Sequence, residues 1–129
     1  MATNFSYAFQ ATSIEEIPAE LFSNVPSNNT SVNFSYCFAE CTSLKSIPTG
    51  LFDTAKKASS FNYCFAACTA LTGESPFTNV DGTKVHLYER KALYQLGFNN
   101  RITGTNCFYN CTGLSDYDKI PSAWGGGAK

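Results

Sequence analysis

The 129-residue sequence predicts one domain of the α/β class, a short solenoid of about four coils that is interrupted by a β-hairpin and a helix. Three observations predict this fold. A unit rich in Phe and Cys recurs four times, residues 72–105 interrupt the recurrence, and 43% of the residues are hydrophobic against 15% charged. A chain this apolar is not disordered. We therefore expect one domain over residues 1–124 and a flexible, glycine-rich tail over 125–129.

Four copies of one unit make up the repeat. Copies 1 and 2 cover residues 4–22 and 33–52, copy 3 begins at Phe61 and breaks off after Leu71, and copy 4 begins at Asn106. The shared pattern is C-F-x-x-C-T-x-L, with Ala in place of Cys in copy 1 and an Ile-Pro pair after copies 1, 2 and 4. One unit cannot bury its apolar face alone, so we expect the copies to stack and their apolar positions to form ladders.

Each copy is predicted to contain a helix and a short extended segment. In copy 2 the spacing i, i+3, i+4 and i+7 of one helix face is filled by Phe34, Cys37, Phe38 and Cys41. Residues 44–48 are predicted to be extended, because the segment ends at Pro48 and a proline favours extended backbone at the residue before it. Helix, turn, strand and loop together give a coil of under 30 residues.

The insert over residues 72–105 is expected to form a hairpin and a helix. Residues 78–87 alternate around Asp81-Gly82, a strong signal for a two-residue hairpin. Residues 90–96 read as a short helix that Gly97 caps. The insert is either a structural buttress or a protruding contact element. Its basic residues are Lys84, Arg90, Lys91 and Arg101.

The pattern F-x-x-C-F-x-x-C-T-x-L-x-x-I-P-x-x-L-F resembles the BspA-like class of leucine-rich repeats, over residues 4–71 and 106–121. The insert and residues 114–126 are similar to the C-terminal portion of phage-type members. The resemblance implies a right-handed leucine-rich-repeat solenoid that serves as a recognition or adhesion module on a bacterial surface or a phage particle. It carries over no catalytic residue.

The six cysteines form three C-x-x-x-C pairs: Cys37/Cys41, Cys64/Cys68 and Cys107/Cys111. Disulfides, a metal site and a ladder of buried thiols are the three alternatives. We favour buried thiols, because an offset of 29 residues up to Gln10 and 30 after it makes Ala8 and Ala11 the copy 1 counterparts of Cys37 and Cys41. An i, i+4 pair is also poorly aimed for a disulfide. His86 is the only histidine and has no ligand motif around it, so we expect no metal, no cofactor and no catalytic role there.

Candidate ligand-binding residues lie off the predicted core. The recurring Phe positions read as core ladders, whereas each of Tyr7, Tyr36 and Tyr63 follows such a Phe by two residues. The tyrosines are either a half-buried ladder or a binding stripe. Charged residues of the loops vary between copies, which suits either recognition on a rigid scaffold or a solvated face. The candidates are Tyr7, Tyr36, Tyr63, Glu16, Lys45, Lys84 and Arg90.

Several function classes are disfavoured. A formal net charge of −1 argues against binding to nucleic acid. No apolar run is long enough to span a membrane, and residues 1–4 do not resemble a secretory signal. The motifs of hydrolases, zinc proteases and phosphate-binding loops do not occur, so we expect no enzyme.

We expect non-enzymatic recognition of a protein or glycan on a cell surface. The alternative is a structural subunit that contacts copies of itself or a larger particle. The apolar positions of copy 1 have no cap before them, so we expect another chain or a longer parent protein to cover them. The resemblance places the protein outside the cell, on a bacterial surface or a phage virion.

Overall fold

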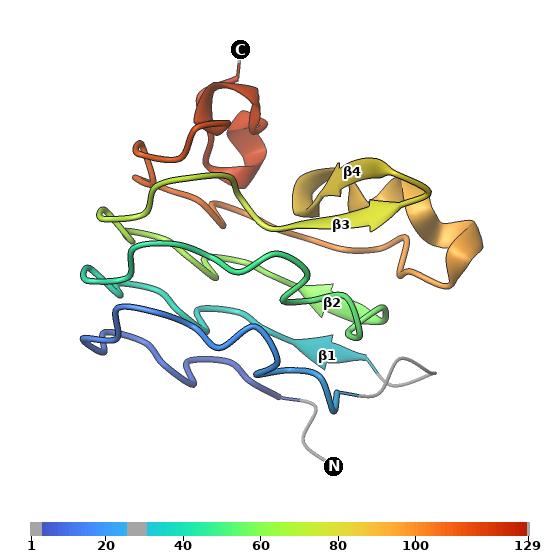
Figure 1. Ribbon diagram of the computed structural model, residues 1–129, viewed down its shortest axis with the longest axis horizontal. Helices are drawn as coiled ribbons and strands as arrows, with labels where there is room; N and C mark the ends of the chain where they lie inside the picture. The colour runs from blue at the N-terminus through green and yellow to red at the C-terminus, as the bar shows by residue number, and fades with distance from the viewer. Residues whose placement is uncertain (1–3, 26–30, 129) are drawn as a thin grey trace.

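The computed structural model describes residues 4–25 and 31–128 and shows a small mixed domain with few strands and short helices (Figure 1). Two short strands pair in parallel, β1 (Val32–Asn33) and β2 (Ala58–Ser60). An antiparallel hairpin consists of β3 (Phe77–Val80) and β4 (Thr83–His86). The helical segments are 3₁₀ helices: η1 (Leu87–Leu96), η2 (Tyr117–Lys119) and η3 (Ser122–Trp124).

The four copies lie side by side as successive layers (Figure 1). Backbone N–H groups of alternate residues in each copy donate to carbonyls of the next copy. From copy 1 to copy 2 the N···O distances are 2.8–3.0 Å, from copy 2 to copy 3 they are 2.7–2.9 Å, and from copy 3 to copy 4 they are again 2.7–2.9 Å. In copy 1 the donors are Phe5, Tyr7, Phe9 and Ala11, and the acceptors in copy 2 are Asn33, Ser35, Cys37 and Ala39. Parallel backbone pairing therefore holds the layers in register.

The segment predicted as a helix in each copy is instead a series of tight turns. In copy 2 the N–H groups of Cys37, Ala39 and Cys41 each donate to the carbonyl three residues earlier. Tyr36 and Glu40 have φ values of 58° and 61°, which no α-helix accommodates. A turn that repeats every four residues places i, i+4 on one face, as a helix does. The spacing of Phe and Cys was therefore compatible with both structures.

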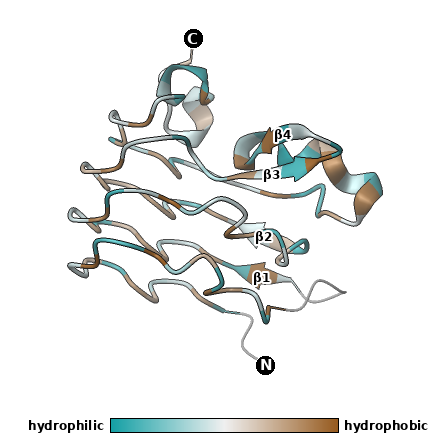
Figure 2. Ribbon diagram, in the orientation of Figure 1, coloured by the Kyte–Doolittle hydropathy of each residue, from teal (hydrophilic) through white to brown (hydrophobic). Residues whose placement is uncertain are grey.

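Stacked Phe rings run through the core. Phe34 lies 5.3 Å from both Phe5 and Phe61, and the rings are within 15° of parallel. A second column consists of Phe9, Phe38, Phe65 and Phe108. These columns lie where the sequence predicts them. Figure 2 shows hydrophobic segments that recur in successive layers, whereas the hairpin carries hydrophilic residues.

The insert packs beside the layers as a hairpin followed by a helix. Asp81 and Gly82 have φ values of 50° and 83°, so the hairpin turn is the left-handed two-residue type that the Asp-Gly pair predicts. The helix begins at Leu87, three residues before the predicted start, and is kinked at Leu93. Gly97, with a φ of 96°, caps it as expected.

Residues 125–128, which we expected to form part of a flexible tail, belong to a C-terminal cap. The N–H groups of Gly126 and Gly127 donate to the carbonyls of Pro121 and Tyr117, at 3.1 and 2.9 Å. A Cβ atom at Gly126 would lie 2.2 Å from the Ile120 carbonyl oxygen, so only glycine fits there. The segment thus closes the last layer together with buried Ile120.

Candidate binding surface

A ladder of tyrosine rings runs across the layers. Tyr36 stacks between Tyr7 and Tyr63, with ring centroids 4.8 Å apart on both sides and interplanar angles of 5° and 8°. Tyr7 is 54% exposed, and the other two rings are half-buried. In copy 4 the position is taken by Asn106, whose Nδ2 donates to the Tyr63 hydroxyl at 3.5 Å. We call Tyr7, Tyr36 and Tyr63 the tyrosine ladder.

The backbone of the tyrosine ladder is left-handed. The φ values are 62° at Tyr7 and 58° at both Tyr36 and Tyr63. A residue with a Cβ pays roughly 1–2 kcal/mol for this conformation, whereas glycine adopts it freely. Tyr nevertheless recurs at this position in three copies, where its ring stacks on the ring of the neighbouring copy. Ring stacking offsets the cost in part, at about 0.5–1.5 kcal/mol per pair.

The tyrosine ladder offers hydroxyl groups to a ligand. Partial burial and then the hydroxyls of Tyr7 and Tyr63 raise the pKa of Tyr36, so it stays an uncharged phenol at neutral pH. A phenol donates and accepts hydrogen bonds. Since the rings stack face to face, the outer face of Tyr7 is the free aromatic surface, and the other two rings present mainly their edges and hydroxyls. The ladder can therefore contact both apolar and polar groups.

The charged candidates Glu16 and Lys45 lie on the surface. Lys45 pairs with Glu15 at 3.0 Å, with exposed side-chain fractions of 69% and 64%. Such an exposed pair contributes little to stability. Glu16 borders an apolar hollow of about 200 Å³ in the first layer, whose other lining residues are Phe9, Ile14, Ile17, Pro18, Leu21 and Phe38.

Lys84 lies in an ionic cluster that joins the hairpin to neighbouring segments. Its Nζ is 2.6 Å from Glu74 Oε1. The two ring nitrogens of His86 face Glu89 Oε1 at 3.1 Å and Glu74 Oε2 at 2.9 Å. Each ring nitrogen that carries a proton can donate to the carboxylate that it faces. Lys84 and then His86 lower the pKa of Glu74. None of these partners of His86 was identified from the sequence. The i, i+3 spacing could have indicated Glu89, but no local pattern indicates Glu74 or Asp116, which lies 3.7 Å from His86.

Ser75, Asp116 and His86 lie together but do not form a catalytic triad. Ser75 is fully buried, and its Oγ donates to Asp116 Oδ2 at 2.6 Å rather than to His86. A nucleophile needs an accessible hydroxyl that is hydrogen-bonded to its base. Within residues 4–25 and 31–128, no group of three His, Cys, Asp or Glu residues is arranged to hold a metal ion.

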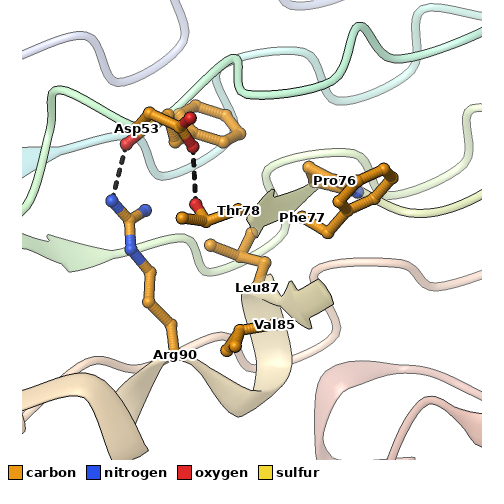
Figure 3. Close-up of a pocket in the computed structure, with 8 residues that line it drawn as sticks. Asp53, Pro76, Phe77, Thr78, Val85, Leu87 and Arg90 are labelled. Atoms are coloured by element: carbon orange, nitrogen blue, oxygen red, sulfur yellow. Dashed lines mark hydrogen bonds between the residues drawn. The ribbon is translucent and has the colours of Figure 1, made fainter. Parts of the chain in front are cut away.

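Arg90 is buried and anchors the insert, which differs from its expected place on a ligand-binding surface (Figure 3). Only 3% of the residue is exposed. One guanidinium nitrogen donates to the carbonyls of Phe52 and Ala55 at 2.6 and 3.1 Å, and the group lies 4.6 Å from the centre of the Phe98 ring. Burial lowers the pKa of Arg90 to about 10, so the side chain stays charged at neutral pH. Nearby, Thr78 donates to Asp53 at 2.5 Å.

The six cysteines are buried free thiols. The second cysteine of each pair donates to the Phe carbonyl of the preceding layer: Cys41 to Phe9 at 3.1 Å, Cys68 to Phe38 and Cys111 to Phe65 at 3.0 Å. Burial raises the pKa of Cys37 and of Cys68 to about 12, so these thiols stay protonated.

The structure changes the alignment of copy 1. Ala11 and Glu40 share the second left-handed position, so the offset of 29 residues continues through Thr12. Thr12, not Ala11, therefore occupies the position of Cys41, and its hydroxyl donates to the Phe9 carbonyl at 2.9 Å. A hydrogen-bond donor thus occupies this position in all four copies, although Thr12 bonds within its own layer and the cysteines bond to the preceding one.

Comparison with protein-family models, with curated proteins and with solved structures gives no match to this chain. Over the described residues, no helix has the length and apolar character needed to cross a membrane.

Proposed function

We propose that this protein is a non-enzymatic recognition module that binds a protein or glycan on a cell surface through the tyrosine ladder. The supporting observation is the recurrence of Tyr at a left-handed position in three successive layers. Strained positions of this kind are enriched at functional sites. We further propose that the stack is a leucine-rich-repeat solenoid carried on a bacterial surface or a phage particle.

The chemistry of the tyrosine ladder suits either class of ligand. Tyrosine combines a rigid apolar ring with a hydroxyl group and loses little conformational entropy on binding. A sugar ring can lie against the open face of Tyr7 while its hydroxyls bond to the phenols. With a net charge of −1, the protein has little long-range attraction for a charged partner, so contact geometry dominates.

Retention of the purified chain by fixed bacterial cells and by immobilised cell-wall glycans tests the proposal. We predict that Tyr7→Ala weakens retention at least tenfold, because it removes the exposed aromatic face. Tyr94→Ala is the matched control, since Tyr94 is 53% exposed but lies in η1, outside the ladder. Equal loss in the two variants, or no loss in Tyr7→Ala, contradicts a binding role of the ladder.

A structural subunit is the second candidate function. The observation that favours it is the apolar hollow in the first layer, together with the 37% exposure of Leu21 at its rim. Contact with copies of the same chain or with a larger particle would bury these groups. Mass measurement in solution separates the candidates: a stable assembly favours the structural role, and a monomer that binds cells favours recognition.

A further inference from the structure

The four backbone hydrogen bonds that join the turn segments of neighbouring copies all run in one direction: each turn segment donates N–H groups toward the next copy and offers carbonyls toward the preceding one. On the other side of the layers single bonds run the opposite way, from Lys45 to Glu15, from Thr72 to Lys45 and from Ser115 to Gly73. The remaining N–H groups turn inward: in copy 1, Ala8 and Gln10 donate to carbonyls three residues earlier, and Ser6 donates to the Asn4 side chain. The turn segment of each layer therefore has a donor side and an acceptor side.

Copy 1 exposes the acceptor side. Its carbonyls equivalent to the acceptors of copy 2 belong to Asn4, Ser6, Ala8 and Gln10. No N–H group of residues 4–25 or 31–128 donates to any of these four oxygens. The outer side of the Phe5 and Phe9 rings faces the same end, because each ring stacks on copy 2 through its other side. We call the four carbonyls and two rings the open edge.

We propose that the open edge binds a coil of the same repeat type from another polypeptide, stacked in parallel and in register. Such a coil offers N–H donors on alternate residues, at the spacing that the four carbonyls require, and brings a Phe ring onto each exposed ring. The apolar hollow beside the edge is then covered as the equivalent groups of deeper layers are.

The same edge of a second copy is excluded as the partner. In two open edges that face each other, the four carbonyls of each edge meet only acceptors, so the set of backbone bonds that joins the turn segments cannot form between them. The opposite end of a second copy also offers few donors, because Asn106 and Phe108 already donate to the C-terminal cap at Ala123 and Trp124. Adding a strand to an open backbone edge is a common mode of recognition. This inference deepens the second candidate function and does not depend on the tyrosine ladder.

A fused chain tests whether the open edge accepts a coil. In this chain, a second copy of residues 31–59 is placed directly before Asn4. Asn4 and Ser60 occupy equivalent positions in their layers, so the new junction between residue 59 and Asn4 has the geometry of the native junction between residues 59 and 60. We expect a single cooperative urea transition with a higher midpoint than that of the parent chain. A control carries the same added residues in scrambled order. If the scrambled extension stabilises the chain as much, or the native extension does not stabilise it, the proposal is overturned.

A labelled peptide tests the contact between separate chains. The probe has the sequence of residues 31–58, and its control is N-methylated at Phe34, Tyr36 and Phe38, which removes three donors. We expect the control peptide to bind the full chain at least tenfold more weakly in fluorescence anisotropy. In the protein, Leu21→Glu should weaken binding to a similar extent, whereas Leu96→Glu, at a 54% exposed position in the insert, should not.

The two measurements decide the proposal together. Binding that N-methylation leaves unchanged, or that Leu21→Glu and Leu96→Glu reduce equally, overturns it. Ordering a single free coil costs conformational entropy, which can prevent the peptide from binding. In that case the urea midpoint of the fused chain decides whether the open edge accepts a coil. Retention on cells is a separate readout, so failure at the open edge leaves the ladder proposal to its own test.

Discussion

At the scale of single residues, two recurring choices define this protein: a thiol that donates to a backbone carbonyl and a tyrosine on left-handed backbone. Cys41, Cys68 and Cys111 donate across the layers, and Thr12 keeps a donor at the same position in copy 1. The thiols thus link neighbouring layers by hydrogen bonds, in addition to filling space in the core.

Replacing a donating thiol should cost more than replacing a packing thiol. We predict that Cys68→Ala lowers the free energy of unfolding by about 1 kcal/mol more than Cys64→Ala, since only Cys68 donates to a carbonyl, that of Phe38. Both residues are fully buried and lose the same sulfur atom, so the packing change is matched. Urea denaturation under reducing conditions measures the difference. Equal losses of unfolding free energy in the two variants would mean that the hydrogen bond from the Cys68 thiol to the Phe38 carbonyl does not stabilise the fold.

Substitutions at Tyr36 should separate backbone strain from ring stacking. Asn tolerates a φ of 58° and already occupies the copy 4 position at Asn106, whereas a β-branched residue does not tolerate it. We predict that Tyr36→Val destabilises the fold by at least about 1 kcal/mol more than Tyr36→Asn. Thermal unfolding of the two variants, both of which lose the stacked ring, gives the comparison. A smaller penalty for Val would contradict left-handed backbone at this position.

At the scale of elements, the insert is attached to the layers through two different kinds of contact. Buried Arg90 bonds the start of η1 to the turn at Phe52 and Ala55. On the other side of the hairpin, Lys84 and His86 pair with Glu74. The first contact is shielded from solvent and the second is partly exposed, so they should respond to different conditions.

Removing the buried contact should loosen the insert. We predict that Arg90→Ala lowers the free energy of unfolding by at least about 2 kcal/mol, because charged hydrogen bonds and packing on Phe98 are lost together. Lys91→Ala is the control, since Lys91 is the exposed neighbour in η1. Hydrogen exchange should report faster opening of residues 77–96 in Arg90→Ala only. Similar behaviour of the two variants would argue against an anchoring role.

The partly exposed contact should weaken in acid. The folded state lowers the pKa of Glu74 from its ordinary value of 4.5, through Lys84 and His86. The contribution of this carboxylate is therefore fully present above about pH 4.5 and is lost as the pH falls through the lower folded value. We predict that Glu74→Gln unfolds with a shallower dependence on pH below this point than the parent chain. Urea titrations between about pH 3 and 6 span the window. An unchanged slope would contradict the ionic contact.

At the scale of the whole molecule, the sequence predicts the columns of stacked Phe rings better than it predicts the backbone conformation of the segments that contain them. The Phe columns, the Asp81-Gly82 turn and the Gly97 cap follow from local patterns. The helices predicted within the copies are tight turns instead. A turn period of four residues and a helix period of 3.6 align the same apolar residues, so their spacing could not distinguish the two structures. Tyr36, at two residues after a core Phe, gave no signal of its left-handed φ.

Contacts between distant segments account for the rest of what the sequence could not show. Arg90 reaches carbonyls 35 and 38 residues away, and backbone carbonyls carry no residue-specific signal. His86 meets Glu74 and Asp116 only because the insert folds back on the last layer. The charge on Arg90 suggested a surface role, yet only the packing of η1 decides that it is buried.

The one-way bonding between the turn segments of neighbouring layers has an electrostatic consequence. In ordinary sheets the peptide dipoles of a strand alternate and largely cancel. Here the peptide groups that join the turn segments point the same way, from the carbonyl oxygens at copy 1 to the N–H groups at copy 4, and they outnumber the bonds that run the opposite way, such as the one from Lys45 to Glu15. Their dipoles add along the stacking axis, as they do along a helix, and leave partial negative charge at the first layer. Each added layer lengthens this aligned column, and cations should gather at the copy 1 end even though the net charge is only −1.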